Sequence, residues 1–262
     1  MDLSIIIVNY KSKAKLINCL HSLSSADFSG INYEIIVVEN ASGDDLSDLL
    51  TPFPNVRWLD SPLNLGMGGG NNFGIRESRG DFILIANPDL LFSYSSVKQL
   101  YEYLRLHTEA AIVGPQLLNP DGSLQYSCAR FPNFFLPLIR RTAFGRYFPS
   151  LVNRYLMRAD NHNEIRVVDW LLGACLMVRR NELFENGCLF DERFFMYFED
   201  VDLCRRASLA GKQVIYYPLA QLTHDHMRDS ARLPWYHAII NDKLAREHLK
   251  SWWKYFKKWG LR

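Results

Sequence analysis

Two β-branched runs near the start of the chain predict its architecture. Residues 3–10 and 33–40, LSIIIVNY and YEIIVVEN, are continuous apolar runs of the kind that form strands buried on both faces of a parallel sheet. The segment between them, from Lys13 to Ser25, carries apolar side chains at helical spacing, namely Leu16, Cys19, Leu20 and Leu23. The first 40 residues therefore predict a β-α-β unit.

Two further strands continue the pattern. VRWLD at 56–60 precedes a glycine-rich stretch, and DFILIANPD at 81–89 follows a helix that Gly80 is expected to end. Four strands by residue 89 indicate a doubly wound α/β sheet, whose ligands lie beyond the carboxyl ends of the strands. The strand ends carry polar residues, namely Asn9, Tyr10, Glu39, Asn40, Asn87 and Asp89. Residues 110–119 and 167–180 predict more strands, separated by an irregular segment from about 130 to 160.

Composition narrows the class of protein. A chain of 262 residues that is 48% hydrophobic can bury a large core, and its net charge of +2 predicts no nucleic-acid partner. Five cysteines without a CxxC pair favour reduced thiols in a cytoplasmic protein. The longest uncharged apolar stretch, at 170–178, has nine residues against the roughly 20 that span a bilayer, and the acidic N-terminus does not resemble a signal peptide.

Residues 64–75, NLGMGGGNNFGI, open a predicted helix with several glycines. The three glycines at 68–70 cost about 3 kcal/mol relative to alanine, which favours a close approach of backbone amides to a phosphate or sugar. Tight packing of the helix on the sheet is the alternative. The stretch matches neither the dinucleotide fingerprint nor the P-loop.

Two clusters of polar residues suggest chemistry. Asn87 and Asp89 flank Pro88, and this pair would suit Mg²⁺ or Mn²⁺ if substrate phosphates and water supplied the remaining ligands; an ordinary Asx turn is the alternative. Glu199, Asp200 and Asp202 follow the aromatic run RFFMYF, and their proximity brings one proton affinity nearer neutrality. Since a helix is expected to start near residue 200, the alternative role of these acids is helix capping.

Six blocks resemble the inverting nucleotide-sugar transferases of glycosyltransferase family 2 over roughly residues 3–226. In order, they are SIIIVNYKS, EIIVVENAS, NLGMGGGNNFGI, ANPD, GACLMVRR and FDERFFMYFEDVDLCRRASLAGKQVIYYP. The resemblance implies a GT-A fold, a Rossmann-like and mostly parallel sheet flanked by helices. It implies a domain over 1–226, with a nucleotide-sugar half at about 1–112 and an acceptor half at about 113–226, and a helical extension over 227–262. The similarity is greatest to a bacterial rhamnosyltransferase-like branch, which uses dTDP-L-rhamnose to make cell-wall or surface polysaccharide.

The resemblance also implies roles for individual residues. Asp89 would bind the metal directly and Asp200 would be the general base, with capping left to Asp202. His224, in preference to His226, would complete the metal site or contact the diphosphate. Glu39 stands where the family often has an aspartate that contacts the base. The expected nucleotide-sugar contacts are Val8, Asn9, Tyr10, Glu39, Asn64, Gly66, Asn71, Asn87 and Glu199.

The C-terminal segment is basic and aromatic. Residues 243–262 contain seven Lys or Arg and one Glu, and one helical stripe is formed by Ala245, Leu249, Trp252, Phe256 and Trp259. This pattern favours a helix lying in an anionic membrane interface, where a polyprenyl-linked acceptor would be found. The alternative is a helix docked on its own domain or on a second subunit in a homodimer. Arginines of the irregular segment would border the acceptor path, or lie in a mobile loop; they are Arg130, Arg140, Arg141, Arg146, Arg154 and Arg158.

These observations predict a metal-dependent inverting glycosyltransferase, cytoplasmic and peripheral at the inner face of the plasma membrane. It would transfer L-rhamnose from dTDP-L-rhamnose to a hydroxyl of a saccharide or lipid-linked acceptor. A nucleotidyltransferase is one alternative, although residues 9–25 lack the basic glycine loop that such enzymes need. A non-catalytic glycan-binding or scaffold protein of the same fold is the other.

Overall fold

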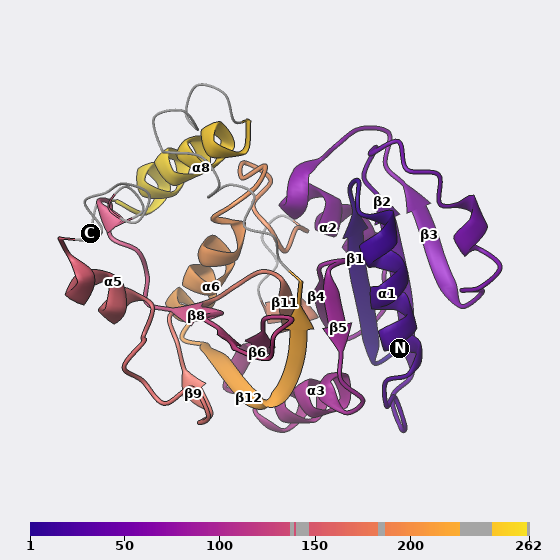
Figure 1. Ribbon diagram of the computed structural model, residues 1–262, viewed down its shortest axis with the longest axis horizontal. Helices are drawn as coiled ribbons and strands as arrows, with labels where there is room; N and C mark the ends of the chain where they lie inside the picture. The colour runs from indigo at the N-terminus through magenta and orange to yellow at the C-terminus, as the bar shows by residue number, and fades with distance from the viewer. Residues whose placement is uncertain (137–138, 140–146, 183–186, 226–242, 261–262) are drawn as a thin grey trace.

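A mixed β-sheet covered by helices on both faces organises the molecule (Figure 1). The computed structural model describes residues 1–136, 139, 147–182, 187–225 and 243–260. Eight strands of the main sheet follow the order β3-β2-β1-β4-β11-β6-β12-β5. The prediction of an α/β fold is therefore confirmed, with a larger antiparallel share than the sequence suggested.

The first four strands of that sheet run parallel, as the predicted β-α-β units require. They are β1 (Leu3–Asn9), β2 (Tyr33–Glu39), β3 (Val56–Asp60) and β4 (Phe82–Ala86). The helices between them are α1 (Lys13–Ser24), the short η1 (Ser47–Leu49) and α2 (Gly66–Arg76).

The second half of the sheet mixes directions. β11 (Cys175–Arg179) pairs antiparallel with β4 on one side and with β6 (Ala110–Leu118) on the other. β12 (Gln213–His224) lies parallel to β6 and antiparallel to β5 (Leu90–Phe92). Short strands are β7 (Leu124–Gln125), β8 (Cys128–Ala129), β9 (Arg166–Val167) and β10 (Trp170–Leu171). The other described helices are α3 (Ser96–Leu106), α5 (Pro149–Tyr155), η3 (Arg180–Glu182), α6 (Glu199–Leu209) and α8 (Lys243–Trp259).

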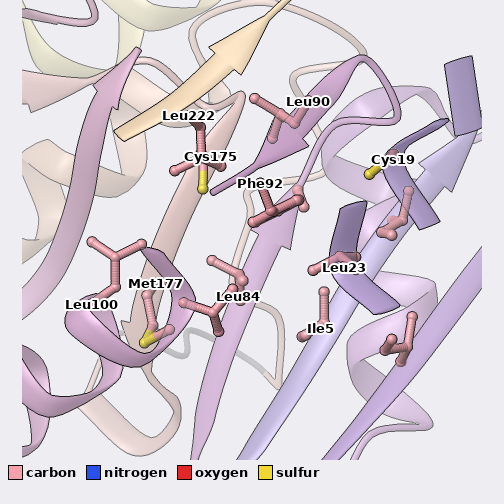
Figure 2. Packing of buried hydrophobic residues seen from close by; sticks show 14 of the residues in the cluster. Ile5, Cys19, Leu23, Leu84, Leu90, Phe92, Leu100, Cys175, Met177 and Leu222 are labelled. Atoms are coloured by element: carbon pink, nitrogen blue, oxygen red, sulfur yellow. The ribbon is translucent and has the colours of Figure 1, made fainter. Parts of the chain in front are cut away.

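Alternate side chains of the central strands fill two separate cores. On β1, Ile5 and Ile7 face the core formed with α1 and α3, whereas Ile6 and Val8 face the core formed with α2 and α6. Figure 2 shows the first core, where Ile5 and Leu84 of the sheet lie near Leu23 of α1. Burial on both faces explains why these strands read as continuous apolar runs. All five cysteines are free thiols, and four of them are buried.

The glycines of α2 permit close packing. A Cβ atom at Gly74 would lie 2.7 Å from Ile6 Cγ2, and one at Gly70 would lie 2.9 Å from Val8 Cγ1. Gly66 has a φ of +75°, and its Cβ would lie 2.0 Å from the carbonyl oxygen of Phe195. Packing of the helix on the sheet is therefore confirmed for Gly70 of the predicted set and for Gly74, whereas Gly66 packs on the loop at Phe195.

The position of Gly80 corrects one expectation. Helix α2 ends at Arg76, so Gly80 does not end it. A Cβ at Gly80 would instead lie 2.4 Å from the backbone nitrogen of Ser4, so glycine is required there because the chain passes directly over β1.

Helix α8 docks on its own domain beside α6 (Figure 1). Its buried residues, Ala245, Ser251, Tyr255 and Phe256, include members of the predicted apolar stripe. That stripe faces protein, so the interpretation that it lies in a membrane interface is corrected in favour of the docked alternative. No helix in the described part of the chain is long and apolar enough to cross a membrane. Arg140, Arg141 and Arg146 lie outside the described residues, as do 227–242 of the predicted extension.

We expect Gly74→Ala to lower the free energy of unfolding by about 1–3 kcal/mol, because the new methyl group collides with Ile6. Intrinsic helix propensity alone predicts the opposite sign, a gain of about 1 kcal/mol. Urea unfolding of the single variants and of the Ile6→Ala/Gly74→Ala double variant measures the collision. In the double variant the added methyl group has room. The loss of unfolding free energy in the double variant should therefore be smaller than the sum of the losses in the two single variants. Equal or higher stability of Gly74→Ala would contradict this packing.

Candidate active site

Polar residues of four strands meet at one edge of the sheet. Asn9 and Glu39 are register partners at the carboxyl ends of β1 and β2. β4 ends in register with the start of β11, where Ala86 faces Cys175. His224, the last residue of β12, faces Leu90, directly after Asp89. The topology therefore brings together Asn9, Glu39, Asn87, Asp89 and His224, five of the residues predicted from the sequence.

Asp89 and His224 form the centre of this edge. Oδ1 of Asp89 lies 3.2 Å from Nε2 of His224, which is 2% exposed. The other ring nitrogen, Nδ1, lies 2.6 Å from Oε1 of Gln125, and Nε2 of Gln125 donates to Asn119, which fixes the amide orientation. With this amide orientation Nδ1 donates to Gln125, and Nε2 is the ring nitrogen that faces the carboxylate of Asp89. An oxygen and a nitrogen that face each other at this distance could bind one cation together.

The Asn87 side chain is available to a ligand. Its Oδ1 is buried and has no hydrogen-bond partner, while its backbone N–H donates to the carbonyl of Ala174 over 2.8 Å. The turn itself is closed by a backbone bond of 3.4 Å from Leu90 to the carbonyl oxygen of Asn87. The side chain does not close this turn, which argues against the Asx alternative.

Two more asparagine side-chain carbonyls are buried without a partner, Oδ1 of Asn9 at the end of β1 and Oδ1 of Asn71 within α2. Leaving a buried acceptor unsatisfied costs roughly 1–3 kcal/mol, so water or a ligand is expected to complete their hydrogen bonding. No group of three or more His, Cys, Asp or Glu side chains with metal-binding geometry occurs among the described residues. A cation here would therefore need further ligands from a substrate, because the turn at Asn87–Asp89 offers few oxygen ligands.

Both carboxylate oxygens of Glu39, the residue predicted to contact the nucleobase, accept hydrogen bonds from other residues of the chain. One oxygen accepts a 2.5 Å hydrogen bond from Nδ2 of Asn9, and the other accepts a 2.6 Å bond from the backbone of Ser42. Asp44, which the sequence reasoning missed, accepts from the same Asn9 amide over 3.0 Å and from the backbone N–H of Ser12 over 3.1 Å. The only sequence signal for Asp44 is an acid placed soon after a strand end.

The remaining nucleotide-sugar predictions separate into exposed and supporting residues. Tyr10 is 39% exposed at the edge, whereas the side chain of Val8 is buried beneath α2. Asn64 accepts a hydrogen bond of 2.9 Å from the backbone of Gly66, which fixes the start of α2. Asn40 reinforces the same turn, since its Oδ1 accepts from Leu65 and its Nδ2 donates to the carbonyl of Gly66.

The acidic pair Glu199–Asp200 opens α6. Oδ2 of Asp200 accepts from the backbone N–H of Gly173 over 2.9 Å, and Oδ1 accepts from that of Val201 over 2.8 Å. Burial raises the pKa of Asp200, and these two hydrogen bonds oppose the increase. Burial, and then the charge of Asp200, raise the pKa of Glu199 to about 8. Oε2 of Glu199 is buried and has no partner. The two carboxyl groups titrate as a pair, of which at least one holds a proton near neutral pH.

Asp202 has a different role from the one predicted. It does not cap α6, because its fully buried side chain accepts hydrogen bonds from Nε of Arg206 at 3.1 Å and from Nε1 of Trp259 at 2.8 Å. Nζ of Lys258 lies 2.7 Å from it. Asp202 is thus an internal anion that joins α6 to α8.

Two consecutive residues connect the turn at Asn87–Asp89 to the acidic pair. Gly173 donates its backbone N–H to Asp200, and the carbonyl of Ala174 accepts from the backbone of Asn87. The turn at Asn87–Asp89 and Asp200 therefore lie on the same side of the molecule. His226 lies outside the described residues, and His224 is placed at the site.

Comparison with known proteins agrees with this geometry. The sequence model of the family described as glycosyl transferase family 2 matches residues 4–168. An N-acetylglucosaminyl-diphospho-decaprenol L-rhamnosyltransferase of Mycobacterium tuberculosis is 32% identical, over 99% of this chain and 89% of that protein. The low-salt glycan biosynthesis hexosyltransferase Agl10 of Haloferax volcanii is 30% identical over 88% and 69% of the two chains. Rhamnosyltransferase WbbL of Escherichia coli is 27% identical over 96% and 91%.

Solved structures support the GT-A fold. Residues 1–349 of Staphylococcus aureus TarS superpose with a TM-score of 0.60 at 16% identity, over 98% of this chain and 73% of that one. GalNAc-T7, solved with UDP, GalNAc and Mn²⁺, gives 0.67 at 13% identity, over 87% and 44%. These relatives do not support the nucleotidyltransferase and scaffold alternatives. The chain belongs to glycosyltransferase family 2 and is a glycosyltransferase.

Proposed function

We propose that this glycosyltransferase transfers L-rhamnose, with inversion, from a nucleoside diphosphate donor such as dTDP-L-rhamnose to a hydroxyl of a polyprenyl-linked saccharide. The observation that carries the proposal is the short connection through Gly173 and Ala174, whose backbone groups bond to the buried carboxylate of Asp200 and to the backbone of Asn87. The activity for which the M. tuberculosis relative is named supports both the sugar and the lipid-linked acceptor. Such an acceptor would bring the protein to the cytoplasmic surface of the membrane.

We assign Asp89 and His224 to a divalent cation, Mg²⁺ or Mn²⁺, with Asn87 beside them. The facing oxygen and nitrogen atoms, 3.2 Å apart, and the unpartnered Oδ1 of Asn87 fit such an ion. When bound, the ion would offset the charge that develops on the leaving diphosphate. Solved structures of the same fold contain UDP, UDP-GlcNAc and Mn²⁺, which supports a nucleotide at this edge. Asn9 and Asn71 would complete their hydrogen bonding on the nucleotide and sugar.

We assign the acidic pair to the acceptor side of the reaction. Asp200 would accept the proton of the attacking hydroxyl, since its carboxylate is oriented by the backbone of Gly173 and Val201. Glu199, with its raised pKa, would be protonated near neutral pH and would donate a hydrogen bond to a sugar hydroxyl. Asp200 would thus take up a proton during the reaction, while Glu199 would keep the proton that it already holds.

Asp89→Asn should lower kcat by about 10²-fold or more, because the charge on the leaving diphosphate is no longer offset. Calorimetry with dTDP and Mn²⁺ should show that the metal no longer strengthens nucleotide binding to the variant. Asp121→Asn, which removes an exposed carboxylate in a turn, is the control and should retain both properties. A metal dependence that survives Asp89→Asn would place the cation elsewhere.

Asp200→Asn should lower the rate of transfer by about 10²- to 10⁴-fold, the usual loss when a general base is removed. Donor binding measured by calorimetry should stay within about twofold of the wild type, since Asp200 acts on the acceptor. Ser208→Ala, an exposed change on the same helix, serves as the control. Transfer that remained within tenfold of the wild type would show that another group takes the proton.

Glu199→Gln should stabilise the protein at high pH. The pKa of Glu199 is about 8 in the folded state against a reference value of 4.5, so the unfolded chain loses this proton first. The wild type therefore loses stability as the pH rises from about 5 to about 8, and the variant does not. Urea unfolding at several pH values should show the difference between the two proteins growing across this window. Glu164→Gln, at an exposed site, should give a flat difference, and a flat curve for Glu199→Gln would contradict the raised pKa.

A further inference from the structure

The two residues directly before the acidic pair have unfavourable backbone conformations. Tyr197 has a φ of 69° and Phe198 a φ of 66°, both in the left-handed region that favours glycine. Such a conformation is strained for a residue that has a side chain, so it persists only where neighbouring structure enforces it. Because α6 begins at Glu199, this two-residue turn sets the direction in which Glu199 and Asp200 leave the loop.

Helix α8 holds the chain on the near side of this turn. Oγ of Ser251, which is 1% exposed, donates a hydrogen bond of 2.7 Å to the carbonyl of Met196. The rings of Tyr255 and Phe198 lie 5.2 Å apart, and the ring of His248 lies 4.8 Å from that of Tyr197. The left-handed turn is thus packed against one face of α8.

The same helix holds α6 on the far side of the acidic pair. Nζ of Lys258 lies 2.8 Å from Oδ2 of Asp191 and 2.7 Å from Oδ1 of the fully buried Asp202. Trp259 donates to that same Asp202 oxygen over 2.8 Å. One ammonium group therefore ties the loop before the turn to the helix after it. Removing one partner of a buried ionic contact leaves an uncompensated charge, so the contact disfavours separation of the two segments.

We propose that α8 is a positioning element for catalysis, in which Ser251 and Lys258 hold the Tyr197–Phe198 turn so that Asp200 meets the backbone N–H of Gly173. Neither Ser251 nor Lys258 lies at the turn at 87–89 or at the strand ends that carry the predicted nucleotide contacts. Both also lie beyond residues 4–168, which the family model matches. The inference rests on the proposed role of Asp200 and adds a role for α8. A shift of about 1 Å at a reacting group costs on the order of 10²-fold in rate, so loss of either contact should reduce catalysis.

Ser251→Ala and Lys258→Met test the proposal, with transfer measured well below the midpoint of thermal unfolding. We expect each variant to lower kcat at least tenfold while the donor KM stays within about twofold. The acid limb of the kcat profile should move to higher pH, because the hydrogen bond from Gly173 lowers the pKa of Asp200 and would be weakened. Lys258→Arg should restore most of the rate, and the exposed Lys257→Met should match the wild type.

Several outcomes would overturn the inference. If Ser251→Ala and Lys258→Met lower the unfolding temperature but leave kcat and the pH profile unchanged, then α8 only stabilises the fold. If Lys258→Met does not fold, Ser251→Ala decides, since it deletes a single hydroxyl. Failure here is distinguishable from failure of the proposed function: a loss of transfer in Asp200→Asn together with an unaffected Ser251→Ala rejects the role of α8 alone.

Discussion

The antiparallel insertion of β11 between β4 and β6 is the constraint on which the active site depends. A strand that runs against its neighbours starts where they end, so the residues before β11 arrive at the carboxyl edge of the parallel strands. Gly173 and Ala174 are those residues, and their two backbone groups bond to Asp200 and to Asn87. A parallel strand at this place would have presented its last residues instead. The direction of one strand thus lets Asp200 and the turn at Asn87–Asp89 share a single support.

Close packing of the α2 backbone determines the shape of the candidate site next to β1. Gly66, Gly70 and Gly74 remove the side chains that would keep α2 away from β1 and from the loop at Phe195. The backbone N–H of Met67 then donates over 2.9 Å to the carbonyl of Phe195. This contact joins α2 to the loop that leads to Glu199. Rigid elements thus hold both halves of the site, as catalytic geometry generally requires.

The sequence predicted the parts of the molecule that depend on local pattern. The apolar runs gave the parallel strands, and the strand ends gave Asn9, Glu39, Asn87 and Asp89 as neighbours, because parallel strands share one polar edge. His224 was reached through the family resemblance, and the structure places it against Asp89. The spacing of Ala245, Leu249 and Trp252 predicted the apolar stripe of α8, but an apolar stripe looks the same whether it meets a membrane or a protein. The partner of that stripe depends on contacts between segments far apart in the chain. The same holds for Asp202, whose partners Lys258 and Trp259 are more than 50 positions away.

The docking of α8 has a consequence for how the protein is made. Asp200 and Ser251 are separated by about 50 residues, so a chain emerging from the ribosome exposes the acidic pair before the helix that supports it. At synthesis rates of about 5–20 residues per second, this interval lasts several seconds. Once His224 has emerged the sheet has all its strands, while the left-handed turn at Tyr197 and Phe198 still lacks its support from α8. The turn that leads into the acidic pair would thus be among the last parts of the candidate site to reach its final conformation.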